Sequence, residues 1–218
     1  IDVHPFQKGS AYLAATHYKF GDYQPYIYKT TNYGKSWTKI VNGIDPTHYT
    51  RAVRADPVRE GLLYAGTERG MYISFDDGDN WQPFQLNLPL TAIRDLHVRG
   101  ESLIAATHGR SFWIIDDLGP VRQLDQGISA EAHHLYGPKP AYRMAQSGSW
   151  GGPDLRLAGE NHPNGVLFNF FINDYEKQKV SLEIQDMAGN TVQVFSSDTT
   201  EKKQQLKIAE DNNSFVWD

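Results

Sequence analysis

Short apolar runs alternate with polar, glycine-rich stretches through the first 125 residues of the chain. Three of these runs end in two small residues followed by Thr, at 14–16, 65–67 and 105–107. Strict alternation of apolar and polar residues over four to eight positions, bounded by Gly, Pro, Asn and Asp, is typical of strands joined by tight turns. The pattern predicts an all-β chain.

One eight-residue turn occurs twice. Residues 30–37 (Thr-Thr-Asn-Tyr-Gly-Lys-Ser-Trp) align with residues 74–81 (Ser-Phe-Asp-Asp-Gly-Asp-Asn-Trp) at an offset of 44 residues. An Asn or Asp side chain at the third position can accept hydrogen bonds from nearby backbone N–H groups, and Gly allows a positive φ. We assign a structural role in the turn to the shared positions, which are Thr30, Asn32, Gly34, Trp37, Ser74, Asp76, Gly78 and Trp81.

The repeat extends beyond the turn. A Pro followed seven residues later by a Tyr occurs at Pro5/Tyr12 and at Pro57/Tyr64. A degraded third copy of the turn is expected with Asp116 at the Asp position, Leu118 at the Gly position and no closing Trp. Four short strands every ~40 residues is the period of a β-propeller blade. The pattern predicts three four-stranded blades in residues 1–125, at about 1–43, 44–88 and 89–125.

The repeat stops after residue 125. Residues 126–164 are rich in polar residues, Gly and Pro, and we interpret them as a linker and loop. Alternation returns at 166–172, and the runs 180–186 and 191–195 are expected to form a hairpin around the turn at 188–190. A second β-domain is therefore predicted at 165–218.

Composition narrows the possible functions. The net charge is −5 and no run of Lys or Arg occurs, so nucleic acid is not an expected partner. No stretch approaches the ~18 apolar residues of a membrane span. The chain contains no Cys, which excludes disulfides and thiolate metal sites. The chain starts at Ile1 and finishes in an apolar run at 215–217, so we expect it to be a fragment or a processed chain.

The repeated turn resembles the Asp-box, or BNR repeat, of sialidases, sortilin-type receptors and related propellers. The runs 25–31, 66–70 and 106–113 are similar to the last blades of large exported bacterial proteins labelled sortilin-like or glycosyl-hydrolase-like. The resemblance covers residues 1–125. It implies export to the periplasm, the cell surface or the medium. It also implies that residues 165–218 form an immunoglobulin-like β-sandwich without its last strands.

Alignment on the small-residue pair and Thr predicts that His17, Glu68 and His108 occupy equivalent positions in the loops after the second strand of each blade. Arg69 and Arg110 lie beside them in the sequence. Such a mixture can bind carboxylates or sugars at one face of a propeller. The alternative is structural, because Arg and His at these loop starts can hold neighbouring loops together through backbone carbonyls.

No catalytic or metal-binding residue is assigned, and no cofactor is expected. The pairs Asp76-Asp77 and Asp116-Asp117 stand next to each other on a strand or turn, so their carboxylates need not converge. The pair His133-His134 lacks further ligands in the sequence pattern.

Three functions remain open: a non-catalytic exported protein that binds a protein or a glycan, a glycoside hydrolase with catalytic residues partly outside this chain, and a purely structural element of an assembly. Three blades do not close a ring, because propellers have about four to eight. The expected partners are therefore the remaining blades, from a parent protein or another chain, and self-association is expected.

Overall fold

The computed structural model describes residues 1–129, 131–141, 164–173, 178–209 and 211–217. The chain folds into two compact units, unit 1 at Ile1–Arg122 and unit 2 at Gln123–Asp218. Almost all regular structure in the described residues is β-strand, which confirms the expected all-β chain. The helices among these residues are short: η1 (Tyr18–Phe20), α1 (Gly119–Gln123) and α2 (Gln126–Ser129).

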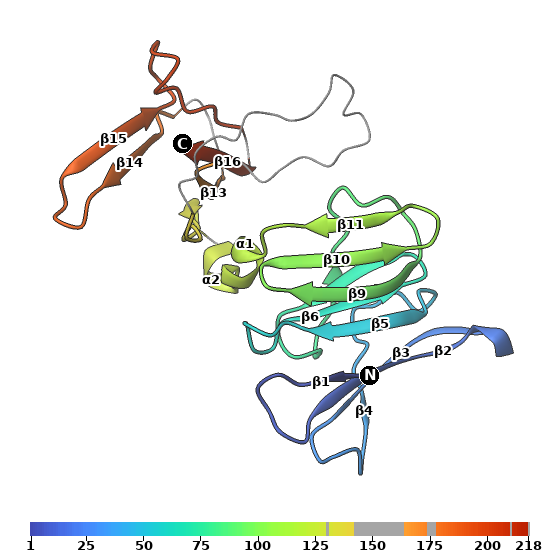
Figure 1. Cartoon of the computed structure of the whole chain (residues 1–218). Helices are drawn as coiled ribbons and strands as arrows, with labels where there is room; N and C mark the ends of the chain where they lie inside the picture. Colours follow the sequence, from blue (N-terminus) through green and yellow to red (C-terminus); the bar gives the residue numbers. More distant parts are fainter. Residues whose placement is uncertain (130, 142–163, 174–177, 210, 218) are drawn as a thin grey trace, which may run out of the picture. The chain divides into compact units, whose positions relative to one another are not determined.

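Unit 1 begins with two antiparallel four-stranded sheets, each formed by consecutive strands (Figure 1). Sheet 1 contains β1 (Asp2–Val3), β2 (Ala11–His17), β3 (Asp22–Thr30) and β4 (Thr38–Lys39). Sheet 2 contains β5 (Thr50–Ala55), β6 (Leu63–Thr67), β7 (Gly70–Ser74) and β8 (Gln82–Pro83). The repeated turn joins the third and fourth strands of both sheets.

The third sheet differs from the four strands expected for residues 89–125. Sheet 3 contains only β9 (Ile93–Arg99), β10 (Ser102–Thr107) and β11 (Phe112–Ile115), in the order β11-β10-β9. Helix α1 follows instead of a fourth strand, and Pro120 stands in its first turn, where a missing N–H is tolerated.

Strand pairing corrects the expected alignment of the third turn. Leu103 pairs with Ile115 as Leu63 pairs with Ser74, so Ile115 corresponds to Ser74. The Asp position is therefore Asp117, not Asp116, and the Gly position is Gly119, one residue after Leu118. Leu118 donates its N–H to the Glu101 carbonyl at 2.9 Å, as Asp77 does to the Gly61 carbonyl at 2.8 Å. Ile115 has no hydroxyl to hold the turn closed, and the chain continues into α1.

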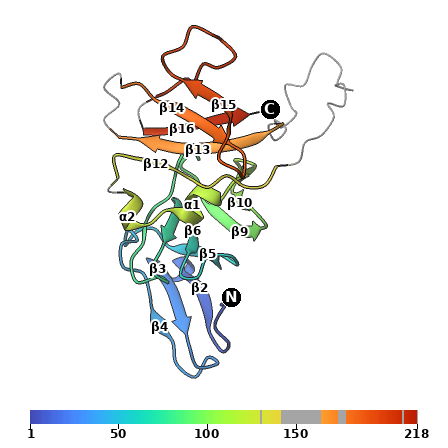
Figure 2. The same ribbon diagram turned by 90° about the vertical axis from the view of Figure 1, so that its left-hand side faces the viewer.

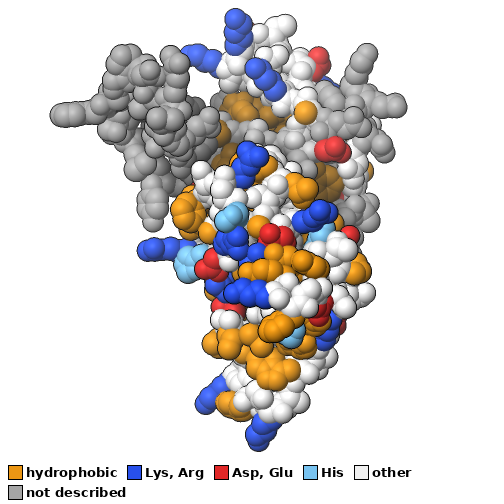
Figure 3. Space-filling model, turned by 90° about the vertical axis from the view of Figure 1, so that its right-hand side faces the viewer, with side chains coloured by type: hydrophobic (Ala, Val, Ile, Leu, Met, Phe, Trp, Pro, Cys, Tyr) orange, Lys and Arg blue, Asp and Glu red, His pale blue; other side chains and the backbone are white. Residues whose placement is uncertain are grey.

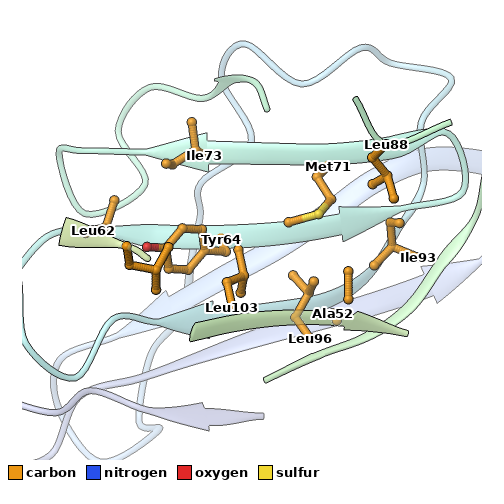
Figure 4. Packing of buried hydrophobic residues seen from close by; sticks show 11 residues of the cluster. Ala52, Leu62, Tyr64, Met71, Ile73, Leu88, Ile93, Leu96 and Leu103 are labelled. Carbon is orange, nitrogen blue, oxygen red and sulfur yellow. The ribbon is translucent and has the colours of Figure 1, made fainter. Parts of the chain in front are cut away.

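Sheet 2 lies between sheets 1 and 3 and buries both of its faces. Its Val53, Leu63 and Trp81 belong to a buried cluster shared with Tyr12 and Ile27 of sheet 1. A second cluster joins sheet 2 to sheet 3 (Figure 4) and includes Leu62, Tyr64, Met71, Ile73, Ile93, Leu96 and Leu103. Each fully buried side chain of this size contributes roughly 1.5–3 kcal/mol, so the two interfaces hold the three sheets together.

Asp56 ties the end of unit 1 back to sheet 2. Its buried carboxylate accepts hydrogen bonds from the Arg122 Nε at 3.0 Å and from the Tyr64 hydroxyl at 3.2 Å. The Arg122 guanidinium also forms an ion pair with Glu101 at 2.8 Å. Because the Asp56–Arg122 pair is buried and hydrogen-bonded, removal of either partner would leave the other as an uncompensated buried charge.

Unit 2 contains two small antiparallel sheets (Figure 2). One has the order β12-β13-β16, with β12 at His133–Leu135, β13 at Val166–Ile172 and β16 at Asp211–Trp217. The other is a hairpin of β14 (Ser181–Gln185) and β15 (Thr191–Ser196). A cluster drawn from both sheets forms the core, with Phe170, Phe195 and Leu206 buried and the Phe195 and Phe215 rings 4.5 Å apart.

The expected hairpin in unit 2 is confirmed. Gly189 has φ +83° in the turn, and the Asp186 carboxylate accepts hydrogen bonds from the Asn190 N–H at 2.9 Å and the Ala188 N–H at 2.8 Å. The linker expected at 126–164 is not without strands, since β12 pairs with β13 from within it. Residues 142–163 of that linker lie outside the described residues.

Candidate functional site

The residues that the sequence predicts for binding lie at the end of β2 (His17) and in the loops after β6 and β10. Tyr18, just after β2, stacks on Tyr49, just before β5, with ring centroids 5.0 Å apart. The Glu68 N–H after β6 donates to the Tyr49 carbonyl at 3.0 Å, and the His108 N–H after β10 donates to the Ala92 carbonyl at 2.8 Å. Figure 3 views unit 1 from the side where β10 ends and shows basic, acidic and histidine side chains interspersed with hydrophobic ones.

Arg51 and Glu68 form the most buried polar pair of this region. The Arg51 Nε donates to a Glu68 carboxylate oxygen at 2.6 Å, and Arg51 Nη2 donates to the Tyr49 hydroxyl at 2.8 Å. The guanidinium also lies over the rings of Tyr18 and Tyr49, 5.4 and 4.9 Å from their centroids. Arg51 is therefore held on several sides by neighbouring loops.

The charge state of Glu68 follows from these contacts. Burial would raise its pKa, but hydrogen bonds from Arg51 and Tyr49 and the nearby charges of Arg51 and Arg94 outweigh burial and lower it. The pKa of the Tyr49 hydroxyl is raised, by burial first and then by its hydrogen bond with Glu68. Glu68 is consequently an ionised carboxylate at neutral pH.

Arg94 and His108 repeat the same pairing one sheet further on. Thr67 pairs with Thr50 and Thr107 with Ile93, so Arg94 corresponds to Arg51 and His108 to Glu68. Arg94 Nε and Nη2 lie 3.2 and 2.9 Å from His108 Nδ1. Because a guanidinium only donates, Nδ1 is the acceptor, and the neutral imidazole carries its proton on Nε2. Unlike Arg51 and Glu68, both side chains of this pair are exposed.

The structure corrects the expected equivalence of His17. Tyr12 pairs with Lys29 as Tyr64 pairs with Ile73, so Tyr12 is equivalent to Tyr64, as the Pro-to-Tyr spacing also indicates. In this alignment the residue equivalent to Glu68 is Thr16, not His17. A β-bulge between Ala15 and His17 separates the two alignments. The exposed His17 pairs with Asp22, and its ring lies 5.2 Å from that of Tyr26.

Arg69 and Arg110 occupy matching turns. The Arg69 N–H donates to the Thr67 hydroxyl at 3.1 Å, and the Arg110 N–H donates to the Thr107 hydroxyl at 3.1 Å. Both side chains are exposed. Sequence reasoning placed these residues next to Glu68 and His108. It did not identify Tyr49, whose signal in the sequence is its position directly before the Thr50-Arg51 strand start.

The two repeated turns share one hydrogen-bond pattern. The Gly78 N–H donates to Ser74 Oγ at 2.9 Å, and the Gly34 N–H donates to Thr30 Oγ1 at 3.0 Å. Likewise Asp76 Oδ1 accepts from the Asn80 N–H at 2.8 Å, and Asn32 Oδ1 accepts from the Ser36 N–H at 3.0 Å. The side chains of Thr30, Asn32, Ser74 and Asp76 thus form the hydrogen bonds that close their own turns.

Asp76 and Asp77 direct their carboxylates to different partners. While Asp76 holds its own turn, Asp77 accepts hydrogen bonds from the Tyr12 hydroxyl and the Lys29 ammonium group of sheet 1. Asp77 therefore connects two sheets and does not form a two-carboxylate centre with Asp76. Within the described ranges, no three His, Asp or Glu side chains gather closely enough to hold a metal ion.

His133 and His134 lie in β12 of unit 2. The His134 Nδ1 lies 2.8 Å from a Glu131 carboxylate oxygen, and its ring packs 4.9 Å from Tyr136 and 6.0 Å from Phe171. His134 is therefore part of the packing around β12.

Comparison with known proteins assigns the chain to no family. No family model matches the chain, and no curated protein matches it. A solved structure of a GH74 enzyme of Niastella koreensis is similar to it, with 19% sequence identity and a TM-score of 0.42. That match covers 53% of this chain and 20% of the enzyme, so the chain spans about a fifth of the length of that protein. No helix in the described part of the chain is long and apolar enough to cross a membrane.

Proposed function

We propose that sheets 1, 2 and 3 are consecutive blades of a β-propeller in an exported protein, and that unit 2 is an incomplete immunoglobulin-like sandwich. Three observations support the first part: the sheets pack face to face in chain order, the same register recurs in each, and two copies of one turn close sheets 1 and 2. The two small sheets around one apolar core support the second part.

The function that this architecture supports best is binding of an acidic protein or glycan at the side of unit 1 where β6 and β10 end. We define the loop face as Glu68, Arg69, Arg94, His108 and Arg110. Arg51 is ion-paired with Glu68, and the charge of Asp45 acts on Arg69, so the exposed Arg94 and Arg110 leave an excess of positive charge. This excess stands out on a chain whose net charge is −5. Guanidinium groups bind carboxylate, sulfate and phosphate groups in a two-pronged geometry.

The observation that carries the proposal is the exposed Arg94–His108 pair. It repeats the Arg51–Glu68 pair in position, but it offers donors instead of a balanced ion pair. Arg94 retains N–H groups beyond those directed at His108, and the His108 tautomer presents Nε2–H as a further donor. Both groups suit an oxygen-rich anionic ligand.

A glycan array with neutral, carboxylated and sulfated oligosaccharides, together with a panel of acidic peptides, tests the proposal. We expect binding to acidic probes, reduced about tenfold by Arg94→Gln, His108→Ala or Arg110→Ala, which corresponds to one charge-assisted hydrogen bond of ~1.4 kcal/mol. Arg99→Gln is the matched control, because Arg99 is exposed at the opposite end of β9. Binding that survives all three loop-face variants, or falls equally with Arg99→Gln, would overturn the proposal.

The glycoside hydrolase alternative has weaker support. Glycoside hydrolysis uses two carboxyl groups, one of which acts as a general acid with a raised pKa. The pKa of Glu68 is lowered, which suits an ionised binding group better than a proton donor. A hydrolase would therefore take its acid from residues other than Glu68.

A further inference from the structure

The connection between sheets 1 and 2 contains an Asn-Gly step. Residues 41–44 form a tight turn after β4, in which the Ile44 N–H donates to the Val41 carbonyl at 3.1 Å. Gly43 has φ +91° at the third position of this turn, a conformation that favours glycine. The exposed Asn42 is therefore followed by a residue that has no side chain to shield its backbone nitrogen.

This turn is docked on the repeated turn that closes sheet 2. The Asn42 carbonyl accepts the Trp81 N–H at 2.8 Å. The Asn42 side-chain amide donates to Asn80 Oδ1 at 2.7 Å and, more weakly, to the Asp79 carbonyl at 3.4 Å. A Cβ on Gly43 would lie 2.1 Å from the Trp81 carbonyl oxygen, so the two backbones are in direct contact. The end of sheet 1 and the closing turn of sheet 2 are thus joined through Asn42 and Gly43.

Asn80 is held so that it requires a donor at position 42. Its Nδ2 donates to Asp76 Oδ2 at 2.8 Å, and its N–H donates to Asp76 Oδ1 at 2.8 Å. Because an ionised carboxylate only accepts hydrogen bonds, Nδ2 must face Asp76, and Oδ1 is the atom that faces Asn42. A carboxylate at position 42 would meet the Asn80 and Asp79 oxygens without a proton to share, on a turn that already contains Asp76, Asp77 and Asp79.

An Asn-Gly step can convert its own amide to a carboxylate. The backbone nitrogen of the glycine loses its proton to solvent and attacks the side-chain Cγ of the asparagine. The new C–N bond closes a five-membered succinimide ring, while the bond from Cγ to the amide nitrogen breaks and ammonia leaves with a proton from solvent. Water then opens one of the two ring C–N bonds and gives Asp or isoaspartate. The net reaction consumes one water and releases one ammonia, with no oxidation or reduction.

We propose that Asn42 is a deamidation site gated by the docking of the two turns, and that its deamidation keeps the turns apart afterwards. The peptide unit between Asn42 and Gly43 supplies the attacking nitrogen, and its carbonyl is held by the Trp81 N–H. Ring closure also removes the amide nitrogen that binds Asn80. The reaction therefore belongs to the open state, in which residues 41–44 have separated from the repeated turn.

The products do not fit the docked arrangement. An Asp at position 42 presents a carboxylate to the fixed Asn80 Oδ1, and an isoaspartate lengthens the main chain by one carbon between residues 42 and 43. Deamidation would thus convert a reversible opening between sheets 1 and 2 into a permanent one. This inference goes beyond the proposed function and does not depend on the loop-face ligand.

Peptide mapping by mass spectrometry after incubation of the full chain in mildly alkaline buffer tests the gating. We expect Asn42 to deamidate about tenfold or more slowly in the folded chain than in urea, which corresponds to an opening free energy of at least ~1.4 kcal/mol. Trp81→Ala, which removes a ring packed between the sheets, should accelerate the reaction toward the rate in urea. The Asn164-Gly165 step of unit 2 is the internal reference, and its rate should be the same in both proteins. Equal rates at Asn42 in the folded chain and in urea, or equal acceleration at Asn164, would overturn the gating.

Hydrogen exchange tests the consequence of the reaction. Asn42→Asp and Asn42→Ala both lose the amide donor, but only Asn42→Asp places a carboxylate against Asn80 Oδ1. The Trp81 amide, which is bonded to the Asn42 carbonyl, should exchange several-fold faster in Asn42→Asp than in Asn42→Ala. Aged wild-type chain carrying the modification, separated by its extra negative charge on ion exchange, should show the same acceleration. Exchange at Trp81 that is as slow in Asn42→Asp and in the aged chain as in fresh wild type would show that deamidation does not hold the turns apart.

Discussion

The two tryptophans of the repeated turn have the same place in the sequence pattern but very different surroundings. Trp81 is 5% exposed and belongs to the cluster between sheets 1 and 2. Its indole N–H donates to the Ile40 carbonyl at 3.0 Å. Trp37 is 39% exposed, and its ring lies 3.8 Å from the place that a Cβ on Gly34 would occupy.

These differences set the expected cost of truncation. Trp81→Ala removes a large buried ring, which costs roughly 3–5 kcal/mol, and this includes much of the penalty for leaving the Ile40 carbonyl unpaired. Trp37→Ala should cost about 1 kcal/mol, as expected for a partly exposed side chain. Trp81→Phe keeps most of the apolar burial but loses the hydrogen bond, and it should fall between them at about 1–3 kcal/mol.

Hydrogen exchange followed by mass spectrometry is the appropriate assay, because the chain has two units and global unfolding need not be two-state. The amides of β5, β6 and β7 report on the sheet to which Trp81 belongs. Since each 1.4 kcal/mol changes an equilibrium tenfold, their exchange in Trp81→Ala should be roughly a hundredfold faster than in Trp37→Ala. Equal acceleration in the two variants would refute the conclusion that only the second tryptophan contributes to an interface between sheets.

Two further predictions concern the same turns. Gly78→Ala should destabilise unit 1 by more than ~2 kcal/mol, and Gly34→Ala by only ~1–2 kcal/mol. Both residues have positive φ, but an added Cβ at Gly78 would also lie 2.4 Å from Ile40 Cδ1. Equal shifts in melting temperature for the two variants would contradict this prediction. Burial opposes ionisation of Asp76, but hydrogen bonds from Asn80 and Ser74 outweigh it and lower the pKa of the carboxyl group. The ionised carboxylate should therefore contribute its full stabilisation above the unfolded-state pKa of about 3.9, and this contribution should disappear as the pH falls through the lower folded-state pKa. The difference in unfolding free energy between wild type and Asp76→Asn should therefore shrink on acidification, and a constant difference from neutral to acidic pH would contradict the assignment.

Local features were predictable from the sequence because nearby residues determine them. The turn at 74–81 is closed by hydrogen bonds between residues four apart, and the hairpin turn at 186–190 is closed in the same way. Alternation likewise identified the strands, because a strand with one buried face must place apolar residues at every second position. These signals require no knowledge of the rest of the fold.

Register was less predictable. Alignment on the small-residue pair made His17 equivalent to Glu68. The strand pairing gives an alignment of sheets 1 and 2 that differs by one residue, with a bulge after Ala15. The third turn was displaced in the same way, with Asp117 in place of Asp116. A shift of one residue exchanges the two faces of a strand, and only contact with a neighbouring sheet decides which face is buried.

The amino-acid sequence by itself determined that the chain is built of β-strands, that a turn closed by Trp37 and Trp81 repeats, and that Glu68, His108 and their arginine neighbours stand at matching loop starts. The tertiary structure decided which of these equivalent positions share the same burial and the same contacts. Trp81 is buried by sheet 1 while Trp37 is not, and Arg51–Glu68 is an ion pair packed on Tyr49 while Arg94–His108 is exposed. The physical reason is that burial and ion pairing depend on sheets brought together from distant parts of the chain, which identical local motifs do not specify.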